Sequence, residues 1–129
     1  MAFLHDIVFD CRHPASLARF WADVLDGYAV APYDDAELER LRALGITDVE
    51  DDPTVLVEGP GHPRLFFQQV PEPKGAKNRV HLDVGAADSA TEVERLVALG
   101  ATVLHRHDEG EHRWVTLADP EGNELCVMG

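Results

Sequence analysis

The sequence predicts an α+β fold built from two tandem βαβββ modules. A short β-rich segment leads directly into an amphipathic helix, and several further β-rich segments follow. The same order restarts after a Pro- and Lys-rich stretch at residues 71–77. We therefore expect one domain of 129 residues, with a first module at about residues 1–70, a linker at 71–77 and a second module at about 78–129.

The first module opens with a predicted strand at residues 4–11 and a helix that starts at Pro14 and stops at Gly27. If Val8 packs beneath this helix, strand alternation places His5 on the helix-free face. The other predicted elements are a strand at 28–33, a helix at 34–44 with a leucine stripe (Leu38, Leu41, Leu44), a solvated acidic loop at 48–53, and a hairpin of strands 54–58 and 64–70 across the turn 59–63.

The second module repeats this order and ends in a tight turn. Pro120 fixes its own φ and Gly122 is free to adopt φ > 0, so the turn holds Glu124 in one register beside its hairpin partner. The predicted elements are a strand at 80–84, a helix at 89–99, strands at 102–105, 113–118 and 124–128, and a charged hairpin loop at 105–112 that could form a rim of a cavity.

The composition excludes several classes of partner. Asp and Glu number 24 against 11 Lys and Arg, and the resulting net charge of −13 repels nucleic acid and anionic membrane surfaces. No apolar run is long enough for a membrane span, and the first residues lack the features of a signal peptide, so we expect a cytoplasmic protein. Cys11 and Cys126 are expected to be reduced, buried thiols.

Four positions stand at matching places in the two modules. His5 and His81 open the first strand of each, while Gln68 and Glu124 lie in the last strand of each, with Gln69 replacing Gln68 if the register slips by one. Two imidazoles and two side-chain oxygens suit Zn, Ni, Fe, Mn or Co. The alternative is metal-free: structural histidines, an exposed Glu124 and a hydrogen-bonding Gln68.

Five further residues are candidates for a substrate pocket. Phe66 and Trp114 have the strand parity to face a pocket, although a place in the core is equally compatible. Asp83 shares the face of His81 and could orient it or accept a substrate proton. Arg79 and Arg113 could pair with an anionic substrate, or could form ordinary surface ion pairs.

Taken together, the histidines, the helix residues 17–21 (LARFW) and the closing residues 119–124 (DPEGNE) resemble the vicinal oxygen chelate superfamily. Residues 67–71 and 78–83 are similar to stretches of small bacterial glyoxalase-like domain proteins. The resemblance implies a curved mixed sheet around a concave pocket with helices outside. It also implies His5, His81 and Glu124 as metal ligands, with Gln68 where glyoxalase I has a glutamate.

The resemblance implies two alternative functions. One is a divalent-metal-dependent lyase, isomerase or dioxygenase acting on vicinal oxygens, in which Glu124 leaves the metal and takes the proton. The other is a metal-free, bleomycin-resistance-like protein that sequesters a drug or natural product. A homodimer is expected in either case, with the pocket formed within one chain or across the dimer.

Overall fold

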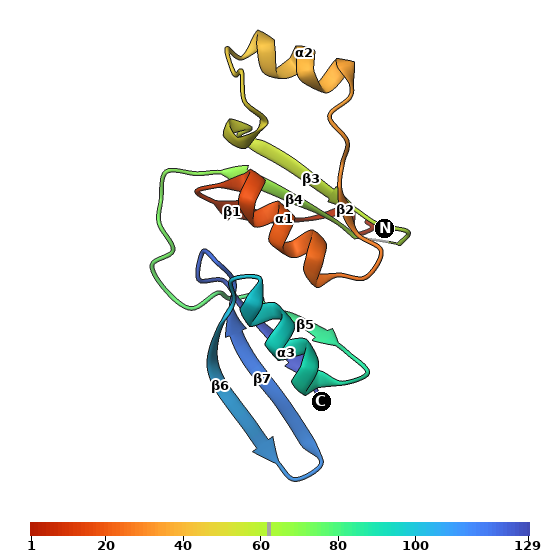
Figure 1. Ribbon diagram of the computed structural model, residues 1–129, viewed down its shortest axis with the longest axis vertical. Helices are drawn as coiled ribbons and strands as arrows, with labels where there is room; N and C mark the ends of the chain where they lie inside the picture. Colours follow the sequence, from red (N-terminus) through yellow and green to blue (C-terminus); the bar gives the residue numbers. More distant parts are fainter. Residues whose placement is uncertain (62) are drawn as a thin grey trace. The chain divides into compact units, whose positions relative to one another are not determined.

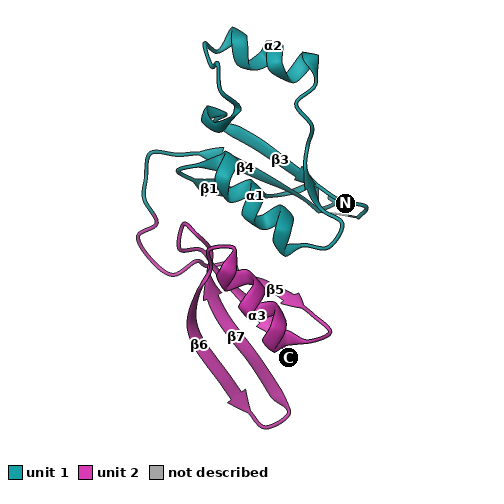
Figure 2. Ribbon diagram, in the orientation of Figure 1, with its two compact units in different colours: residues 1–73 teal, residues 74–129 magenta. Residues whose placement is uncertain are grey.

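The computed structural model describes residues 1–61 and 63–129 (Figure 1). The chain forms two compact units, Met1–Pro73 and Lys74–Gly129 (Figure 2). The boundary falls in the stretch that the sequence marks as a linker, residues 71–77. Each of these, the first unit and the second unit, has its own four-stranded sheet and its own core.

Both units have the same topology. The first sheet has the order β1-β4-β3-β2, the second has β5-β8-β7-β6, and in each the first strand pairs in parallel with the last. This confirms the α+β class and the two tandem βαβββ modules. The elements are β1 (Asp6–Cys11), α1 (Pro14–Val24), β2 (Ala29–Val30), α2 (Asp35–Ala43), the 3₁₀ turn η1 (Val49–Asp51), β3 (Thr54–Glu58), β4 (Arg64–Gln69), β5 (Leu82–Gly85), α3 (Ser89–Ala98), β6 (Thr102–Glu109), β7 (His112–Ala118) and β8 (Glu124–Met128).

In the first unit, α1 covers one face of the sheet. Trp21 and Leu17 of α1 are completely buried, and the Trp21 ring lies 5.0 Å from that of Phe9 in β1. Phe9 therefore faces the helix, and alternation turns Val8, which is 50% exposed, to the opposite side. The prediction that Val8 packs beneath the helix is wrong. We call the side of each sheet not covered by α1 or α3 its open face.

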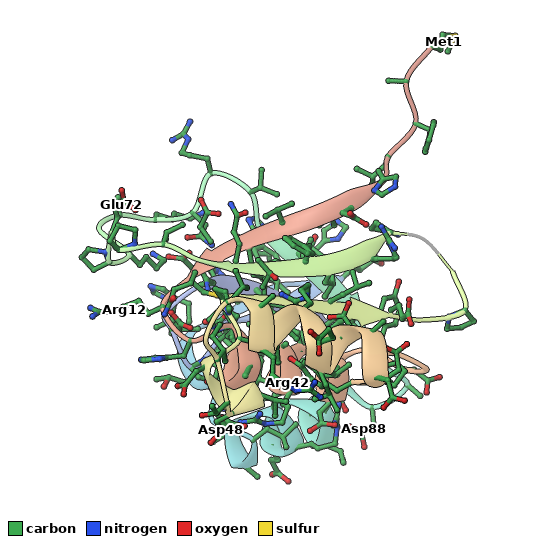
Figure 3. The ribbon with its side chains drawn as sticks, turned by 90° about the horizontal axis from the view of Figure 1, so that it is seen from above. Met1, Arg12, Arg42, Asp48, Glu72 and Asp88 are labelled. Carbon is green, nitrogen blue, oxygen red and sulfur yellow. The ribbon has the colours of Figure 1, made fainter. Side chains whose placement is uncertain are left out.

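His5 lies outside β1. The first residues extend beyond the strand as an exposed segment with Met1 at its tip (Figure 3). The placement of His5 on the helix-free face was inferred from Val8, so that inference loses its basis in the structure.

Helix α2 is attached to the first unit through its Arg40 guanidinium, which donates to Asp52, and through the buried Leu41. Its N-cap, Asp34, accepts a hydrogen bond from the Glu37 amide. Of the predicted leucine stripe only Leu41 is buried, while Leu38 and Leu44 are exposed. The prediction of a buried leucine stripe is therefore wrong for Leu38 and Leu44, because α2 does not lie flat on an apolar surface.

Two other segments of the first unit differ from expectation. The strand predicted at 28–33 is only Ala29–Val30, with one further hydrogen bond from the Ala31 amide to the Leu56 carbonyl of β3. The acidic loop 48–53 contains the short turn η1, in which the Asp48 side chain accepts from the Glu50 amide. The predicted turn 59–63 includes His62, which lies outside the described residues.

In the second unit, α3 buries Val93 and Leu96 on the sheet. The sheet contributes Leu117 of β7 with Leu125 and Val127 of β8, all fully buried. Because these residues alternate along their strands, Thr116, Cys126 and their same-parity neighbours face the open side. The core of this unit thus determines which side chains are available for a site.

The predicted loop at 105–112 is wrong. β6 and β7 run through this segment as a regular hairpin and turn only at Gly110 and Glu111, where Gly110 has φ 72°. β6 is an edge strand with mostly exposed side chains, so its charged composition does not oppose pairing. As a result His105 lies opposite Thr116, and His107 lies opposite Trp114.

The closing turn has the geometry that the sequence predicts. The buried Asp119 carboxylate accepts from the amides of Glu121 and Asn123, and Gly122 has φ 90°. Glu124 then begins β8 in register with Ala118. Among the described residues no helix combines the length and apolarity of a membrane span. Both cysteines are buried and neither forms a disulfide.

Candidate functional site

The open face of the second unit carries a pocket of about 440 Å³. Asp83 on β5, Cys126 on β8 and Thr116 on β7 form one row across the sheet, because each is the register partner of the next. The same face therefore gathers side chains that are far apart in sequence. The pocket is lined by Lys77, His81, Asp83, Trp114, Thr116, Glu124, Cys126 and Met128.

Three potential donor groups meet in this pocket. Single ligand atoms of His81, Asp83 and Cys126 all lie within 4.8 Å of one another. The His81 Nε2 atom is 3.3 Å from Asp83 Oδ1, and the Cys126 thiol is 3.4 Å from the Thr116 hydroxyl. His81 and Asp83 are partly exposed whereas Cys126 is 6% exposed, so the thiol forms the inner end of the cluster.

Glu124 lies at the edge of the pocket and is held by two donors. Its Oε2 atom accepts from the Asn78 amide at 3.0 Å, and its Oε1 atom accepts from the Lys74 ammonium at 3.1 Å. Burial by itself would raise the pKa of the Glu124 carboxyl, but the Asn78 amide and the Lys74 charge outweigh it and hold that pKa below its ordinary value. The carboxylate is therefore ionised and already paired.

An aromatic stack borders the same pocket. The Trp114 indole and the His107 imidazole are stacked, with ring centroids 4.5 Å apart and an angle of 13° between planes. His105 lies next along β6, its ring 5.3 Å from that of His107. Of these three residues Trp114 alone lines the pocket, and His107 stacks on its indole from the neighbouring strand β6.

In the first unit, the counterpart of His81 is Asp6 and not His5. Asp6 precedes α1 by eight residues, as His81 precedes α3, and it pairs in register with Arg64. In the second unit Leu82 pairs with Leu125, and the residues directly before these two are His81 and Glu124. His81 and Glu124 therefore correspond to Asp6 and Arg64 of the first unit. The match of His5 to His81 is therefore wrong by one residue. Because side chains alternate between the two faces of a strand, the residue of β1 on the same face as His81 in its own sheet is Asp6.

The first unit fills this position with an ion pair. The Arg64 guanidinium donates to both carboxylate oxygens of Asp6, at 2.8 and 3.2 Å, and His5 Nδ1 lies 2.9 Å from the same carboxylate. Hydrogen bonding from Arg64 holds the pKa of Asp6 below its ordinary value. A guanidinium at this point repels a metal cation.

Gln68 lies at the other end of β1 and β4 from His5. It pairs with Asp10, to which its amide donates at 2.6 Å, whereas His5 lies beyond the Asp6–Arg64 pair. Four residues at roughly 3.3 Å each separate these pairs by about 13 Å. The structure does not bring His5 and Gln68 together. Gln69 has the opposite parity and donates to the Arg12 carbonyl.

The five predicted pocket residues separate into three groups. Asp83 and Trp114 line the pocket of the second unit with His81 and Glu124. Phe66 lines a different pocket, on the open face of the first unit. Arg79 is not among the lining residues, and Arg113, whose guanidinium is 3.2 Å from Asp108, has the parity opposite to Trp114.

Sequence reasoning missed Cys126 and Thr116. Cys126 lies two residues beyond Glu124 and therefore shares its strand face. Strand alternation from Glu124 would have placed Cys126 on the pocket side from the sequence alone. Thr116 has the same relation to Trp114. Only the pairing of β5 with β8 shows that Cys126, and not Glu124, lies beside Asp83.

Two tandem βαβββ units, each with an open sheet face, define the chain as a vicinal oxygen chelate fold. The profile of the glyoxalase-like domain matches residues 6–128, and the chain belongs to that family. No curated protein matches the sequence.

Solved structures share the fold at low sequence identity. A glyoxalase/bleomycin resistance protein/dioxygenase family enzyme from Burkholderia phytofirmans superposes with a TM-score of 0.69 at 16% identity, covering 98% of each chain. The fosfomycin resistance protein FosX from Mesorhizobium loti gives 0.67 at 14% identity, covering 99% of this chain and 91% of its own. A glyoxalase family protein from Bacillus cereus gives 0.62 at 17% identity, covering 99% and 93%.

Proposed function

We propose that the protein binds a small organic molecule in the pocket of the second unit. The observation that carries this proposal is the meeting of an imidazole, a carboxylate, a thiol and an indole at one pocket of about 440 Å³. Such a mixture of a few polar groups with apolar walls, at this size, is typical of ligand sites.

The chemistry of the lining favours a flat, oxygen-bearing ligand. Trp114 and Met128 offer apolar contact, and the stacking of Trp114 on His107 fixes the indole plane. His81 and Asp83 are partly exposed and can accept or donate hydrogen bonds to hydroxyl groups. Catechol combines a flat ring with two vicinal oxygens and is a suitable probe.

The two tryptophans provide an internal control for binding. Trp114 lies in the pocket, whereas Trp21 is buried in the core of the first unit. In a titration with catechol followed by ¹H–¹⁵N NMR, we expect saturable shifts of the Trp114 indole N–H and of amides 81–83 and 124–128, with the Trp21 indole unchanged. The Trp21→Phe variant assigns the two signals.

Variants test whether the polar groups contribute. His81→Ala is expected to weaken catechol binding on the order of tenfold, the loss of one to two hydrogen bonds. His112→Ala, at the hairpin end and outside the pocket lining, should bind as the parent does. Equal affinity of parent and His81→Ala, or shifts confined to the first unit, would overturn the proposal.

A second candidate function is a metal-dependent enzyme, favoured by the close approach of His81, Asp83 and Cys126. Imidazole nitrogen, carboxylate oxygen and thiolate sulfur are all ligands of Zn²⁺, and three protein ligands leave a position open for substrate. The donor set therefore fits a divalent metal. A bound metal would supply Lewis-acid polarisation of vicinal oxygens.

In this candidate function Glu124 acts as the base. Its ionised carboxylate lines the same pocket, and exchange of its Lys74 contact for a substrate proton would make it the acceptor. His81, Asp83 and Cys126 would hold the metal beside it.

Cobalt distinguishes the possible ligand sets. Co²⁺ bound by Cys126 gives a thiolate-to-metal absorption that Cys126→Ser removes, and His81→Ala weakens cobalt binding. If the ligands are instead His5, His81, Glu124 and Gln68, then His5→Ala and Gln68→Ala weaken binding while Cys126→Ser has no effect. A parent protein that binds no cobalt excludes this second function and leaves catechol binding to be judged on its own result.

The proposal includes a homodimer, which is the assembly expected of a short chain with two modules. Light scattering coupled to size exclusion at micromolar concentration is expected to give twice the chain mass of 14.2 kDa. A monomer under these conditions contradicts the dimer without affecting the pocket.

A further inference from the structure

A second pocket, of about 510 Å³, lies on the open face of the first unit. Its floor includes Leu56 of β3 and Phe66 of β4, which are register partners on the same face. Its wall is formed by residues 31–34, which we call the strap, and by Glu37 and Arg40 of α2. All of its lining residues belong to the first unit, so it is separate from the site described above.

One buried carboxylate ties this wall to the sheet. Asp52 is 1% exposed and accepts from the Tyr33 hydroxyl at 2.7 Å, from Arg40 at 2.9 Å and from the Thr54 amide at 3.0 Å. Burial and the hydrogen bond to Asp52 raise the pKa of Tyr33, which keeps its hydroxyl protonated as a donor. The strap and α2 are therefore held in place before any ligand arrives.

The charge of the pocket is strongly negative. Among the described residues that line the pocket, the only cation is Arg40, and its guanidinium is already bound to Asp52 and to Glu37. The lining contains four carboxylates for this single guanidinium: Asp34, Glu37, Asp52 and Glu58. Glu58 is exposed at the end of β3, so its charge is available to a ligand.

We infer that this pocket is a second ligand site and that its ligand is an amphipathic cation, an apolar or aromatic body carrying an ammonium group. The body would lie on Phe66 and Leu56, and the ammonium would face Glu37 and Glu58. The Phe66 ring adds cation–π attraction. An anionic ligand is disfavoured because the Arg40 guanidinium is already paired with the carboxylates of Glu37 and Asp52.

The test uses benzyltrimethylammonium, whose charge does not change with pH, and benzylsulfonate as its anionic counterpart. In ¹H–¹⁵N NMR titrations of the whole chain at low salt, we expect saturable shifts with the cation at residues 31–40, 52–58 and 66. Benzylsulfonate should leave these residues unchanged. Shifts centred on residues 81–83 and 114–128 with the cation, or no saturable shift at all, would overturn the inference.

Matched variants test the charge and the floor separately. Glu58→Gln and Phe66→Leu should each weaken the cation on the order of threefold, the effect of one screened charge contact or one ring contact. Glu39→Gln removes a carboxylate from the same helix at a position outside the pocket and should bind as the parent does. An equal loss in Glu39→Gln and Glu58→Gln would show a general charge effect and refute the site. Circular dichroism confirms that each variant is folded.

Discussion

At the scale of single residues, the two units place opposite chemistry at one position of the same sheet. In the second unit this position holds His81 and Glu124, beside the potential metal ligands Asp83 and Cys126. In the first unit it holds Asp6 and Arg64, which neutralise each other. The first unit therefore holds a carboxylate–guanidinium pair where the second unit holds an imidazole and a carboxylate.

The Asp6–Arg64 pair predicts a pH effect. The folded-state pKa of Asp6 lies below its ordinary value of 3.8, so the pair adds stability above that value and loses it as the pH falls through the folded-state pKa. In Arg64→Gln, we expect the pKa of Asp6 to rise toward 3.8. A ¹³C NMR titration of the Asp6 carboxyl group measures it.

Arg42→Gln is the control for this experiment. It removes an exposed arginine that pairs with Glu39 on α2 and should leave the Asp6 titration unchanged. The same Asp6 pKa in the parent and in Arg64→Gln would contradict the pairing. The parent and Arg64→Gln should also have the same free energy of unfolding at pH values below the folded-state pKa of Asp6.

At the scale of the elements, the helices begin in different ways. α1 starts at Pro14, whose φ suits the first turn, and its N-cap His13 makes no side-chain cap bond. α3 starts after Asp88, which accepts from both the amide and the hydroxyl of Thr91. The amide of Thr91 is the main cause of the lowered pKa of Asp88.

This cap predicts the cost of its removal. Asp88→Ala leaves the first amides of α3 without a side-chain acceptor and should lower the free energy of unfolding. Asp88→Ser should restore most of it, because serine also caps. Urea denaturation at neutral pH measures both, and Glu94→Ala, on an exposed position of the same helix, is the control. A Glu94→Ala loss as large as that of Asp88→Ala would show that the cap has no special role.

At the scale of the whole molecule, the net charge of −13 opposes the compact state. Surface carboxylates far from any basic partner repel one another, and salt screens this repulsion over a Debye length of about 10 Å at 0.1 M. The charge also disfavours anionic partners, in agreement with the cationic ligand inferred for the first unit.

Salt is therefore expected to stabilise the protein. Raising NaCl from 10 to 150 mM should increase Tm by a few degrees, roughly the effect of 1 kcal/mol in a chain of this size. Differential scanning calorimetry measures the change. Glu111→Lys at the hairpin tip reduces the net charge by two and should give a smaller increase; an unchanged or larger increase would contradict the screening explanation.

The sequence by itself determined the repeat, the class of fold and the closing turn. Helical spacing in α1 and the Pro120–Gly122 turn are local properties, so they could be predicted from neighbouring residues. Asp83 and Trp114 were assigned to a pocket face for the same reason, because strand alternation is local.

Only the tertiary structure decided which side chains meet. Strand register brings Cys126 beside Asp83 and places Asp6 at the position assigned to His5, and a shift of one residue exchanges the two faces of a strand. The attachment of α2 through Asp52 also depends on contacts between distant residues. Local patterns specify elements, whereas a site is made by the pairing between them.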